Sequence, residues 1–313
     1  MRMKVVRGAE GGVVVDHLEE PPGSGELVQM RATSVCASDL LYLRYGTTKI
    51  LGHELAGVRA DGTPVVVEAM YGCMECPDCL RGRYNLCPTH PQRALGITTD
   101  GGMSEQFLAP AGRLITLPVG LDVCDASIVE PATVSWHALR LAGAGPNTRV
   151  AIVGAGALGL LAAAGARHMG VTDLALEARH RFQIEAAERL GVTVGTDGLY
   201  DVVVEAAGTV ESLARAIDLV GSHGTVVVLG VHVGSVDVPW SPLFHREARL
   251  LPSLGYCAHD GRREMEDAAA MLAANPEIAR TVITHRFPIE DAVEAFRVAG
   301  DRSARSIRVV IEP

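Results

Sequence analysis

Apolar and polar residues follow two different patterns along the chain, and the change falls near residue 130. Before it, short β-type apolar runs stand among many glycines and prolines, for example "VVV" at 13–15, "ELVQMRAT" at 26–33 and "PVVVEA" at 64–69. This texture predicts a compact, mostly β unit. From about residue 132, short apolar runs alternate with longer helical stretches. That alternation is typical of βαβ units on a parallel sheet, so an α/β fold is expected.

The length of 313 residues points to the same division. A single hydrophobic core stops growing at roughly 250 to 300 residues, so a chain of this size is expected to split into two domains. Hydrophobic residues make up 48% of the chain and charged residues 21%, which is ordinary for a globular protein and excludes a disordered one.

The segment "VAIVGAGALGLL" carries a chemical signal in the second unit. Gly154, Gly156 and Gly159 form the pattern G-x-G-x-x-G after the apolar run "RVAIV" and at the start of a helix of small residues. In that position the first glycine permits a tight turn, the second lets the backbone approach a pyrophosphate, and the third allows close helix packing. Free N–H groups at the helix start bind the anion. We therefore expect this turn, which includes Leu158, to bind a dinucleotide and not to be a bare structural turn.

The end of the next apolar strand predicts which nicotinamide cofactor is bound. An acidic residue there binds the ribose 2′-OH of NAD, whereas a basic residue suits the 2′-phosphate of NADP. In "LALEARHR", Ala178 falls where the acid is expected and Arg179 follows it. Glu177 is one residue early, and strand alternation points it to the opposite face from Ala178. NADP is therefore favoured and NAD stays possible, because Arg179 and Arg181 would also suit an exposed helix start.

Charge and the N-terminal sequence narrow the class of protein further. The net charge is −9, and the 28 basic residues are spread along the chain without a block that would follow a phosphate backbone. Nucleic acid is therefore not an expected partner. The N-terminus lacks the features of a secretion signal, and no apolar run approaches the roughly 18 residues of a membrane span. A reducing, cytoplasmic location without membrane association is expected.

Four of the seven cysteines lie close together in "CMECPDCLRGRYNLC", at residues 73–87. In a reducing compartment, closely spaced cysteines hold a metal more often than they pair with each other. Four thiolates can close a tetrahedral shell around zinc, and donors from one short loop give a structural site. We therefore expect a structural zinc ion, and not disulfides or free thiols, at Cys73, Cys76, Cys79 and Cys87.

Further candidate residues are scattered through the first unit. The segments "VCASDLLYLRYGTTKILGHELAG" and "VEPATVSWHAL" contain them: Cys36, Ser38, Asp39, His53, Glu54 and Glu130. Taken singly, a cysteine or a histidine is more often structural than a metal ligand. Only the combination of these residues with the other motifs points to a function.

Together these motifs resemble the zinc-dependent medium-chain dehydrogenases over nearly the whole chain. The elements that match are "CASD", "GHE", the four-cysteine segment, "DGGMSEQFLAP", "VEPATVSWHAL", "VAIVGAGALG", "VVVEAAG" and "THRFPIEDAVEAFRVA". The "VEP" element is similar to the sorbitol, butanediol and threonine dehydrogenase branch. The resemblance implies a GroES-like β domain with the zinc lobe at 1–131 and a Rossmann domain, a doubly wound parallel sheet, at 132–254. A segment at 255–313 would return to the first domain.

The resemblance also implies roles for the matching residues. A catalytic zinc, whose fourth position stays open for substrate, would be held by Cys36, His53 and Glu130. Glu54 matches a second carboxylate that sits behind the metal or coordinates it directly. Asp39 would receive the other ring N–H of His53 and orient that ligand.

The implied activity is hydride transfer between a secondary alcohol or polyol, or the matching ketone or aldehyde, and the nicotinamide cofactor. Zinc would act as the Lewis acid that lowers the pKa of the bound alcohol. Ser38 matches the hydroxyl that passes the substrate proton outward. A histidine that often ends this relay is replaced by Leu41. Two zinc ions per chain and a homodimer or homotetramer are further implications of the resemblance.

Two other functions fit parts of the pattern: a zinc-stabilised nucleotide-binding protein without catalysis, and a zinc-independent enone or quinone reductase of the same fold. The first is disfavoured because the matching zinc ligands and Ser38 are all present, and the second because the cysteine segment and "GHE" are complete. Only sixteen residues separate Cys36 from His53, so trimmed loops are expected to widen the substrate cleft or change the subunit interface. Cys124 and Cys257 are expected to be small core residues.

Overall fold

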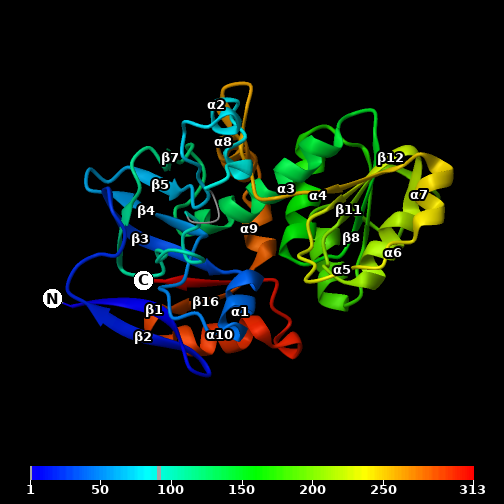
Figure 1. Ribbon diagram of the computed structural model, residues 1–313. Helices are drawn as coiled ribbons and strands as arrows, with labels where there is room; N and C mark the ends of the chain where they lie inside the picture. The colour runs from blue at the N-terminus through cyan, green and yellow to red at the C-terminus, as the bar shows by residue number, and fades with distance from the viewer. Residues whose placement is uncertain (1, 90–92) are drawn as a thin grey trace. The chain divides into compact units, whose positions relative to one another are not determined.

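The computed structural model describes residues 2–89 and 93–313, and the chain divides into two units. Unit 1 comprises Met1–Glu130 and Tyr256–Pro313, and unit 2 comprises Pro131–Gly255. Both boundaries lie one residue from the ones expected from the sequence. The C-terminal stretch is part of the same unit as the N-terminal stretch (Figure 1).

Unit 1 is built on a sheet of strand order β16-β17-β3-β4-β5-β7, with β6 paired to β3. The long strand β3 (Glu26–Val35) pairs antiparallel with β4 (Leu55–Arg59) and with β17 (Arg308–Glu312), where Val309 lies opposite Val35. The last strand of the chain therefore reaches the end of β3. The other strands of this sheet are β5 (Pro64–Val67), β6 (Gln106–Ala109), β7 (Leu114–Thr116) and β16 (Ile283–Pro288).

Unit 1 also contains two hairpins and several short helices. The hairpins pair β1 (Met3–Ala9) with β2 (Gly12–Leu18) and β14 (Ala258–His259) with β15 (Arg262–Arg263). The α-helices are α1 (Ala37–Arg44), α2 (Pro77–Leu80), α8 (Glu264–Ala274), α9 (Glu277–Val282) and α10 (Ala292–Gly300). The 3-10 helices are η1 (Tyr84–Leu86), η3 (Ala126–Ile128), η4 (Ile289–Asp291) and η5 (Arg302–Ala304). Helix α3 (Val129–Ala142) begins at the end of unit 1 and continues into unit 2.

The core of unit 1 holds the C-terminal elements against the start of the chain. Phe296 from α10 and Ile311 from β17 belong to one buried cluster with Val35 and Leu51. Fully burying one such large apolar side chain stabilises the fold by roughly 1.5–3 kcal/mol. The packing therefore keeps β17 beside the end of β3, where Cys36 follows.

Unit 2 is a parallel sheet of strand order β10-β9-β8-β11-β12-β13 (Figure 1). Its strands are β8 (Arg149–Val153), β9 (Asp173–Glu177), β10 (Thr193–Val194), β11 (Tyr200–Glu205), β12 (Val220–Val228) and β13 (Arg249–Pro252). The helices are α4 (Ala157–His168), α5 (Arg181–Arg189), α6 (Val210–Leu219) and α7 (Trp240–Arg246). The strand order reverses between β8 and β11, and sheets of this kind bind ligands outside the carboxyl ends of the strands at that point.

The expected fold class, a β-rich unit joined to a doubly wound parallel sheet, is confirmed. Val150, Ala151 and Ile152 of β8 are fully buried, as a strand covered on both faces requires. Within residues 2–89 and 93–313, no helix combines the length and the apolar character needed to cross a membrane.

Candidate active site

Cys36, His53 and Glu54 come together in unit 1. One donor atom from each lies within 4.8 Å of the other two. Cys36 is the N-cap of α1, and His53 and Glu54 directly precede β4. Because β3 and β4 run antiparallel, with Thr33 opposite Leu55, the end of one strand meets the start of the other. Strand pairing therefore joins two motifs that are separate in the sequence.

The two ring nitrogens of His53 face different side chains. Ser38 Oγ lies 3.3 Å from Nε2, and Asp39 Oδ1 lies 3.5 Å from Nδ1. The other oxygen of Asp39, Oδ2, accepts a 2.9 Å hydrogen bond from the backbone N–H of Cys36. Asp39 is fully buried, and it links the backbone of Cys36 to the ring of His53.

Burial and neighbouring charges have opposite effects on the pKa values of His53 and Asp39. Burial acts to lower the pKa of His53, but the charges of Asp39 and Cys36 outweigh it and raise that pKa well above its usual range. Burial also raises the pKa of Asp39, while the charge of His53 and the N–H of Cys36 oppose the rise. The surroundings of His53 therefore stabilise a positive charge.

Arg308 of β17 brings a buried cation to the site, which was not expected from the sequence. Its Nη1 donates to Glu54 Oε1 at 3.0 Å and to the carbonyl of Val35 at 2.9 Å. The side chains of Arg308 and Glu54 are 6% and 0% exposed. The sequence carried one signal for it. Arg308 begins the apolar run "RVVI", and a charged residue that is buried with such a strand is almost always paired with an opposite charge.

Glu130 lies in the first turn of α3 and is 6% exposed. Among the described side chains, its carboxylate is not one of the donor atoms that meet within 4.8 Å at Cys36 and His53. Burial raises the pKa of Glu130 to about 8, with the charge of His53 lowering it and that of Glu54 raising it further. Glu130 is therefore an electrostatic neighbour of the group without being part of it in this arrangement.

The donor set suits a zinc ion. Catalytic zinc takes thiolate, imidazole and carboxylate donors at three positions and keeps a fourth position open. Cys36, His53 and Glu54 offer one donor of each kind, and Oε2 of Glu54 is buried without a hydrogen-bond partner. Leaving such an atom unsatisfied costs roughly 1–3 kcal/mol. Coordination of a cation would remove that cost.

A second group of donors lies in the loop that contains α2 and η1. The sulfur atoms of Cys73, Cys76, Cys79 and Cys87 lie within 4.8 Å of one another, and each residue is a free thiol. Backbone N–H groups point at three of the sulfurs, from Cys73 to Cys87 Sγ and from Cys76 to Cys73 Sγ, both at 3.2 Å, and from Cys79 to Cys76 Sγ at 3.5 Å. Burial opposes ionisation of Cys87, but the Thr89 hydroxyl and the Cys73 N–H lower its pKa to about 5. These bonds favour thiolate, the form that binds metal.

In unit 2, the turn between β8 and α4 requires glycine at two positions. A Cβ on Gly154, where φ is +110°, would lie 2.9 Å from the Cβ of Ala207, and one on Gly159 would lie 1.8 Å from the Gly154 carbonyl oxygen. At Gly156, the N-cap of α4, an added Cβ would have nothing within 4 Å. The helix N-terminus is therefore open, and the turn fits a pyrophosphate.

Glu177 is the last residue of β9, and its surroundings differ from those of the two residues that follow it. Ala178 is half-buried and Arg179 is exposed. The carboxylate of Glu177 is bound by Arg215 of α6 and by Thr196. These two partners were not identified from the sequence.

Comparison with known proteins tests the resemblance directly. The family model described as the alcohol dehydrogenase GroES-like domain matches residues 24–119, and the model described as the glucose dehydrogenase C-terminus matches residues 118–312. The chain belongs to the medium-chain zinc dehydrogenases. The two matches overlap at residues 118–119 and together span residues 24–312, so the GroES-like unit and the nucleotide-binding sheet of this fold are both present.

Relatives of this medium-chain dehydrogenase include enzymes named for polyols and sugar acids. It is 28% identical to sorbitol dehydrogenase 1 of Saccharomyces cerevisiae, with 85% of each chain covered. It is 26% identical to L-galactonate-5-dehydrogenase of Escherichia coli, with 88% of each covered. The crystal structure of a zinc-binding dehydrogenase from Sinorhizobium meliloti 1021 bound to NADP matches all of both chains at 28% identity and a TM-score of 0.88.

One further residue links the turn of this dehydrogenase to α3. Ser135 Oγ donates to the carbonyl of Leu158 at 2.9 Å and to that of Pro131 at 3.2 Å. Leu158 was expected at the cofactor, and in unit 2 its carbonyl oxygen holds α3 against the start of α4. Of the two remaining cysteines, Cys257 is buried as expected, whereas Cys124 is only half-buried.

Proposed function

We propose that this protein transfers a hydride between a secondary alcohol or polyol, or the matching ketone or aldehyde, and a nicotinamide cofactor, with the help of zinc. The observation that carries the proposal is the meeting of the Cys36, His53 and Glu54 donor atoms within 4.8 Å. The same chain has a complete dinucleotide turn. Relatives named sorbitol dehydrogenase and D-altritol 5-dehydrogenase support polyols as the substrate class.

Cys36, His53 and Glu130 are the proposed ligands of the catalytic zinc. Zinc in this position supplies Lewis acidity to the substrate oxygen. The donor atom of Glu54 lies inside the 4.8 Å group and that of Glu130 lies outside it. A ligand role for Glu130 therefore needs its side chain to move toward Cys36 and His53, and Glu54 is the competing carboxylate.

Ser38 is the proposed acceptor of the substrate proton. Its Oγ lies 3.3 Å from His53 Nε2, so it stands next to the proposed metal ligand. Asp39, bonded to the N–H of Cys36, holds the opposite side of the ring. Leu41 cannot relay a proton, so the proton beyond Ser38 leaves through water or the cofactor ribose.

NADP is the proposed cofactor, with NAD as the alternative. Gly154, Gly156 and Gly159, with Leu158 between them, would hold its pyrophosphate at the open N-terminus of α4. Ala178 has no carboxylate for the ribose diol, and that of the neighbouring Glu177 is bound by Arg215 and Thr196. The exposed Arg179 suits a 2′-phosphate. The relative from Sinorhizobium meliloti was solved with NADP, which supports the choice.

The four-cysteine loop is the proposed structural zinc site. Its four sulfurs fill a tetrahedral shell and leave no open position. The proposed location is the reducing cytoplasm that the sequence predicts, where closely spaced cysteines hold a metal more often than they form disulfides.

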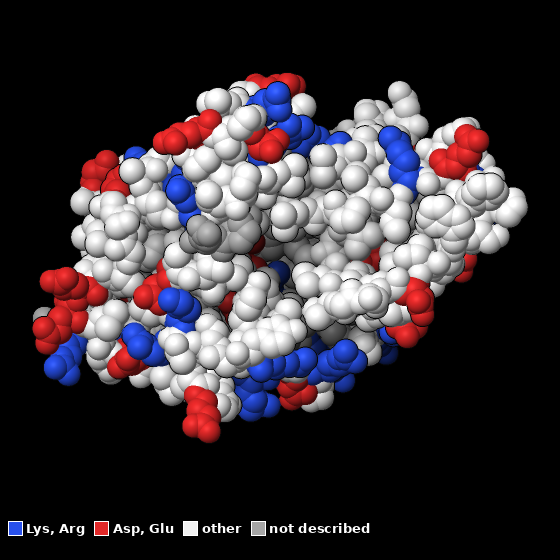
Figure 2. Space-filling view, viewed as in Figure 1, with Lys and Arg blue, Asp and Glu red and all other residues white. Residues whose placement is uncertain are grey.

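A small-molecule substrate is the proposed partner. On the face shown in Figure 2, Lys and Arg side chains are interspersed with Asp and Glu, and uncharged residues cover most of the surface. Such mixed charge suits a small polar ligand better than a nucleic acid, which needs a continuous basic track.

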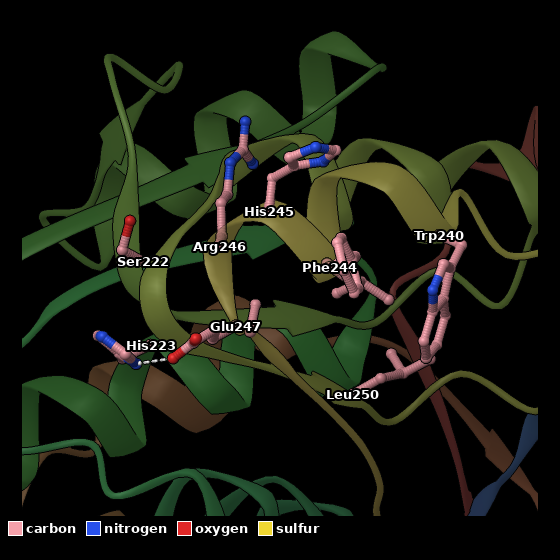
Figure 3. A pocket seen from close by; sticks show the side chains of 10 residues that line it. Ser222, His223, Trp240, Phe244, His245, Arg246, Glu247 and Leu250 are labelled. Carbon is pink, nitrogen blue, oxygen red and sulfur yellow. Dashed lines mark ion pairs between the residues drawn. The ribbon is translucent and has the colours of Figure 1, made fainter.

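A homodimer or homotetramer is also proposed, and one edge of unit 2 supports it. Strand β13 ends the sheet, and the neighbouring helix α7 has Trp240 at 69% and Phe244 at 66% exposure. Figure 3 shows both rings at a groove that Leu250 of β13 also lines. Exposed aromatic residues at a terminal strand are typical of a protein interface. Light scattering coupled to gel filtration measures the molecular mass.

The activity is tested by screening secondary alcohols, diols, polyols and the matching ketones with both cofactors. We expect oxidation of at least one polyol or diol with NADP. Reduction of enones that survives complete removal of zinc would favour a zinc-independent reductase. Absence of turnover across the screen, with cofactor still bound, would favour a non-catalytic binding protein.

A further inference from the structure

The last residue of β9, Glu177, lies next to the glycine turn of unit 2. Its carbonyl oxygen accepts a 3.1 Å hydrogen bond from the N–H of Gly154. Sheets of this kind place an acidic side chain at this end of the strand to bind the two ribose hydroxyls of NAD. Glu177 therefore carries a carboxylate within one residue of the position that decides the cofactor.

The carboxylate of Glu177 is held by two neighbours. Arg215 Nη2 donates to Oε1 at 2.7 Å, and Arg215 Nε lies 3.0 and 3.2 Å from Oε1 and Oε2. Thr196 Oγ1 donates to Oε1 at 2.6 Å and accepts from Arg215 Nη2 at 3.0 Å. The three side chains form a closed triangle of hydrogen bonds, which we call the Glu177 clamp.

The clamp occupies Oε1 of Glu177 and offsets the charge of the carboxylate. Oε1 accepts from Arg215 and Thr196, and Oε2 accepts only from Arg215 Nε at 3.2 Å, so a ribose diol would have to compete with the guanidinium for this carboxylate. The positive charge of Arg215 also cancels the negative charge that would repel a 2′-phosphate. The ion pair is part-exposed, at 45% for Arg215 and 26% for Glu177, so its contribution to folding stability is small.

Arg179 differs from the other arginines near this edge. Arg215 is paired with Glu177, and Arg181 is paired with Glu185 at 2.9 Å. Across the part of the chain that the structure describes, the side chain of Arg179 makes no hydrogen bond or ion pair, and its charge acts only at longer range on Glu211 of α6. One carboxylate is thus neutralised while one guanidinium stays available, and both features favour a phosphorylated ribose.

We propose that Arg215, with Thr196, is a specificity-determining residue, because holding Glu177 in the clamp turns the cofactor preference from NADH toward NADPH. The inference rests on the proposed function, since it requires a nicotinamide dinucleotide at this turn. It goes beyond that proposal by giving a role to a residue of α6 that is 38 positions from Glu177 in the sequence.

The test measures the dissociation constants of NADPH and NADH by calorimetry for the wild type, Arg215→Met and Glu177→Gln/Arg215→Met. In Arg215→Met the released carboxylate repels the 2′-phosphate and binds the ribose diol. We expect the ratio of the NADH constant to the NADPH constant to fall about ten-fold, a change that corresponds to 1.4 kcal/mol. In the double variant no charge is released, so the ratio should return to within about two-fold of wild type.

Arg297→Met is the matched control, because it removes another helical arginine from a two-point pair, with Glu294 in unit 1, at 2.7 Å for both bonds. Its ratio should equal that of the wild type. Raising the salt concentration should shrink the loss of NADPH affinity in Arg215→Met, since the effect is electrostatic. Melting temperatures of all variants show whether any change follows from lost stability.

Different results would overturn the proposed function and the role of the clamp. A wild type that binds neither cofactor overturns the proposed function. A wild type that prefers NADH overturns the proposed cofactor and the clamp together. A wild type that prefers NADPH, combined with an unchanged ratio in Arg215→Met or with no rescue in the double variant, overturns the clamp alone.

Discussion

The two donor groups of unit 1 are built in opposite ways. The four-cysteine loop takes all its donors from residues 73–87, and local backbone N–H groups point at the sulfurs. The Cys36 group takes its donors from the ends of β3 and β4, beside a cation from β17. A local loop can close a shell by itself, whereas the second group exists only when the sheet has formed.

The donors differ as much as their origin does. Four thiolates satisfy zinc completely, whereas thiolate, imidazole and carboxylate donors at three positions leave room for a substrate. Around the second group, Asp39, Glu54 and Glu130 are all buried, and of these three Arg308 donates a hydrogen bond to Glu54. Buried charges need partners or a metal. The difference supports the proposed structural ion in the loop and the proposed exchangeable, reactive ion at Cys36.

Metal removal gives the largest expected effect and tests this difference directly. The purified protein should hold about two zinc ions per chain. Brief treatment with a chelator should remove one of them, because a site with an open position exchanges metal more readily, and activity should fall to background. Elemental analysis and the melting curve measure the outcome. Simultaneous loss of both ions, with unfolding, would show that the two sites are not distinct.

Glu130→Ala tests the ligand set of the open site. Loss of a metal ligand should lower turnover by at least about 100-fold, since even residues that only support a ligand contribute 10- to 100-fold. The fold and the zinc of the cysteine loop should persist. Glu54→Gln, which removes the competing carboxylate, is the comparison variant. Wild-type turnover in Glu130→Ala, with a large loss in Glu54→Gln, would transfer the ligand role to Glu54.

Cys87→Ser tests the closed site. Removing one of four donors should release the structural zinc and lower the melting temperature by roughly 4–8 °C, which corresponds to about 2 kcal/mol for a domain of this size. Catalytic zinc should remain, so turnover below the melting range should change little. Cys124→Ser, outside both groups, is the control and should melt like the wild type. An unchanged melting temperature in Cys87→Ser would contradict a structural ion.

The smallest expected effect is a change of cofactor preference in unit 2. Replacing Ala178 with Asp and Arg179 with Leu gives the ribose diol an acceptor and removes the guanidinium that suits the phosphate. The preference, measured as kcat/KM for each cofactor, should reverse from about ten-fold for NADP, the value of one retained charge-assisted bond, to a preference for NAD. An unchanged ratio would mean that another loop reads the ribose.

The features that depend on local spacing could be predicted from the sequence alone. The four cysteines, the glycine turn and the alternation of strands and helices each lie in a short window, so their spacing predicted the lobe, the dinucleotide turn and the α/β fold before any packing was known. The "GHE" and "CASD" segments were also recognisable, because each residue of the motif is adjacent to the others.

Which distant side chains meet became visible only in the folded structure. Arg308 and Glu54 are 254 positions apart, and the pairing of β17 with β3 is what brings them together. Arg215 meets Glu177 because α6 packs on the face of the sheet to which Glu177 points. Burial and charge at such contacts depend on the whole fold, and no spacing in the sequence encodes them. For this reason both Glu54 and Glu130 could be identified as candidates from the sequence, but not which of them lies nearer to Cys36 and His53.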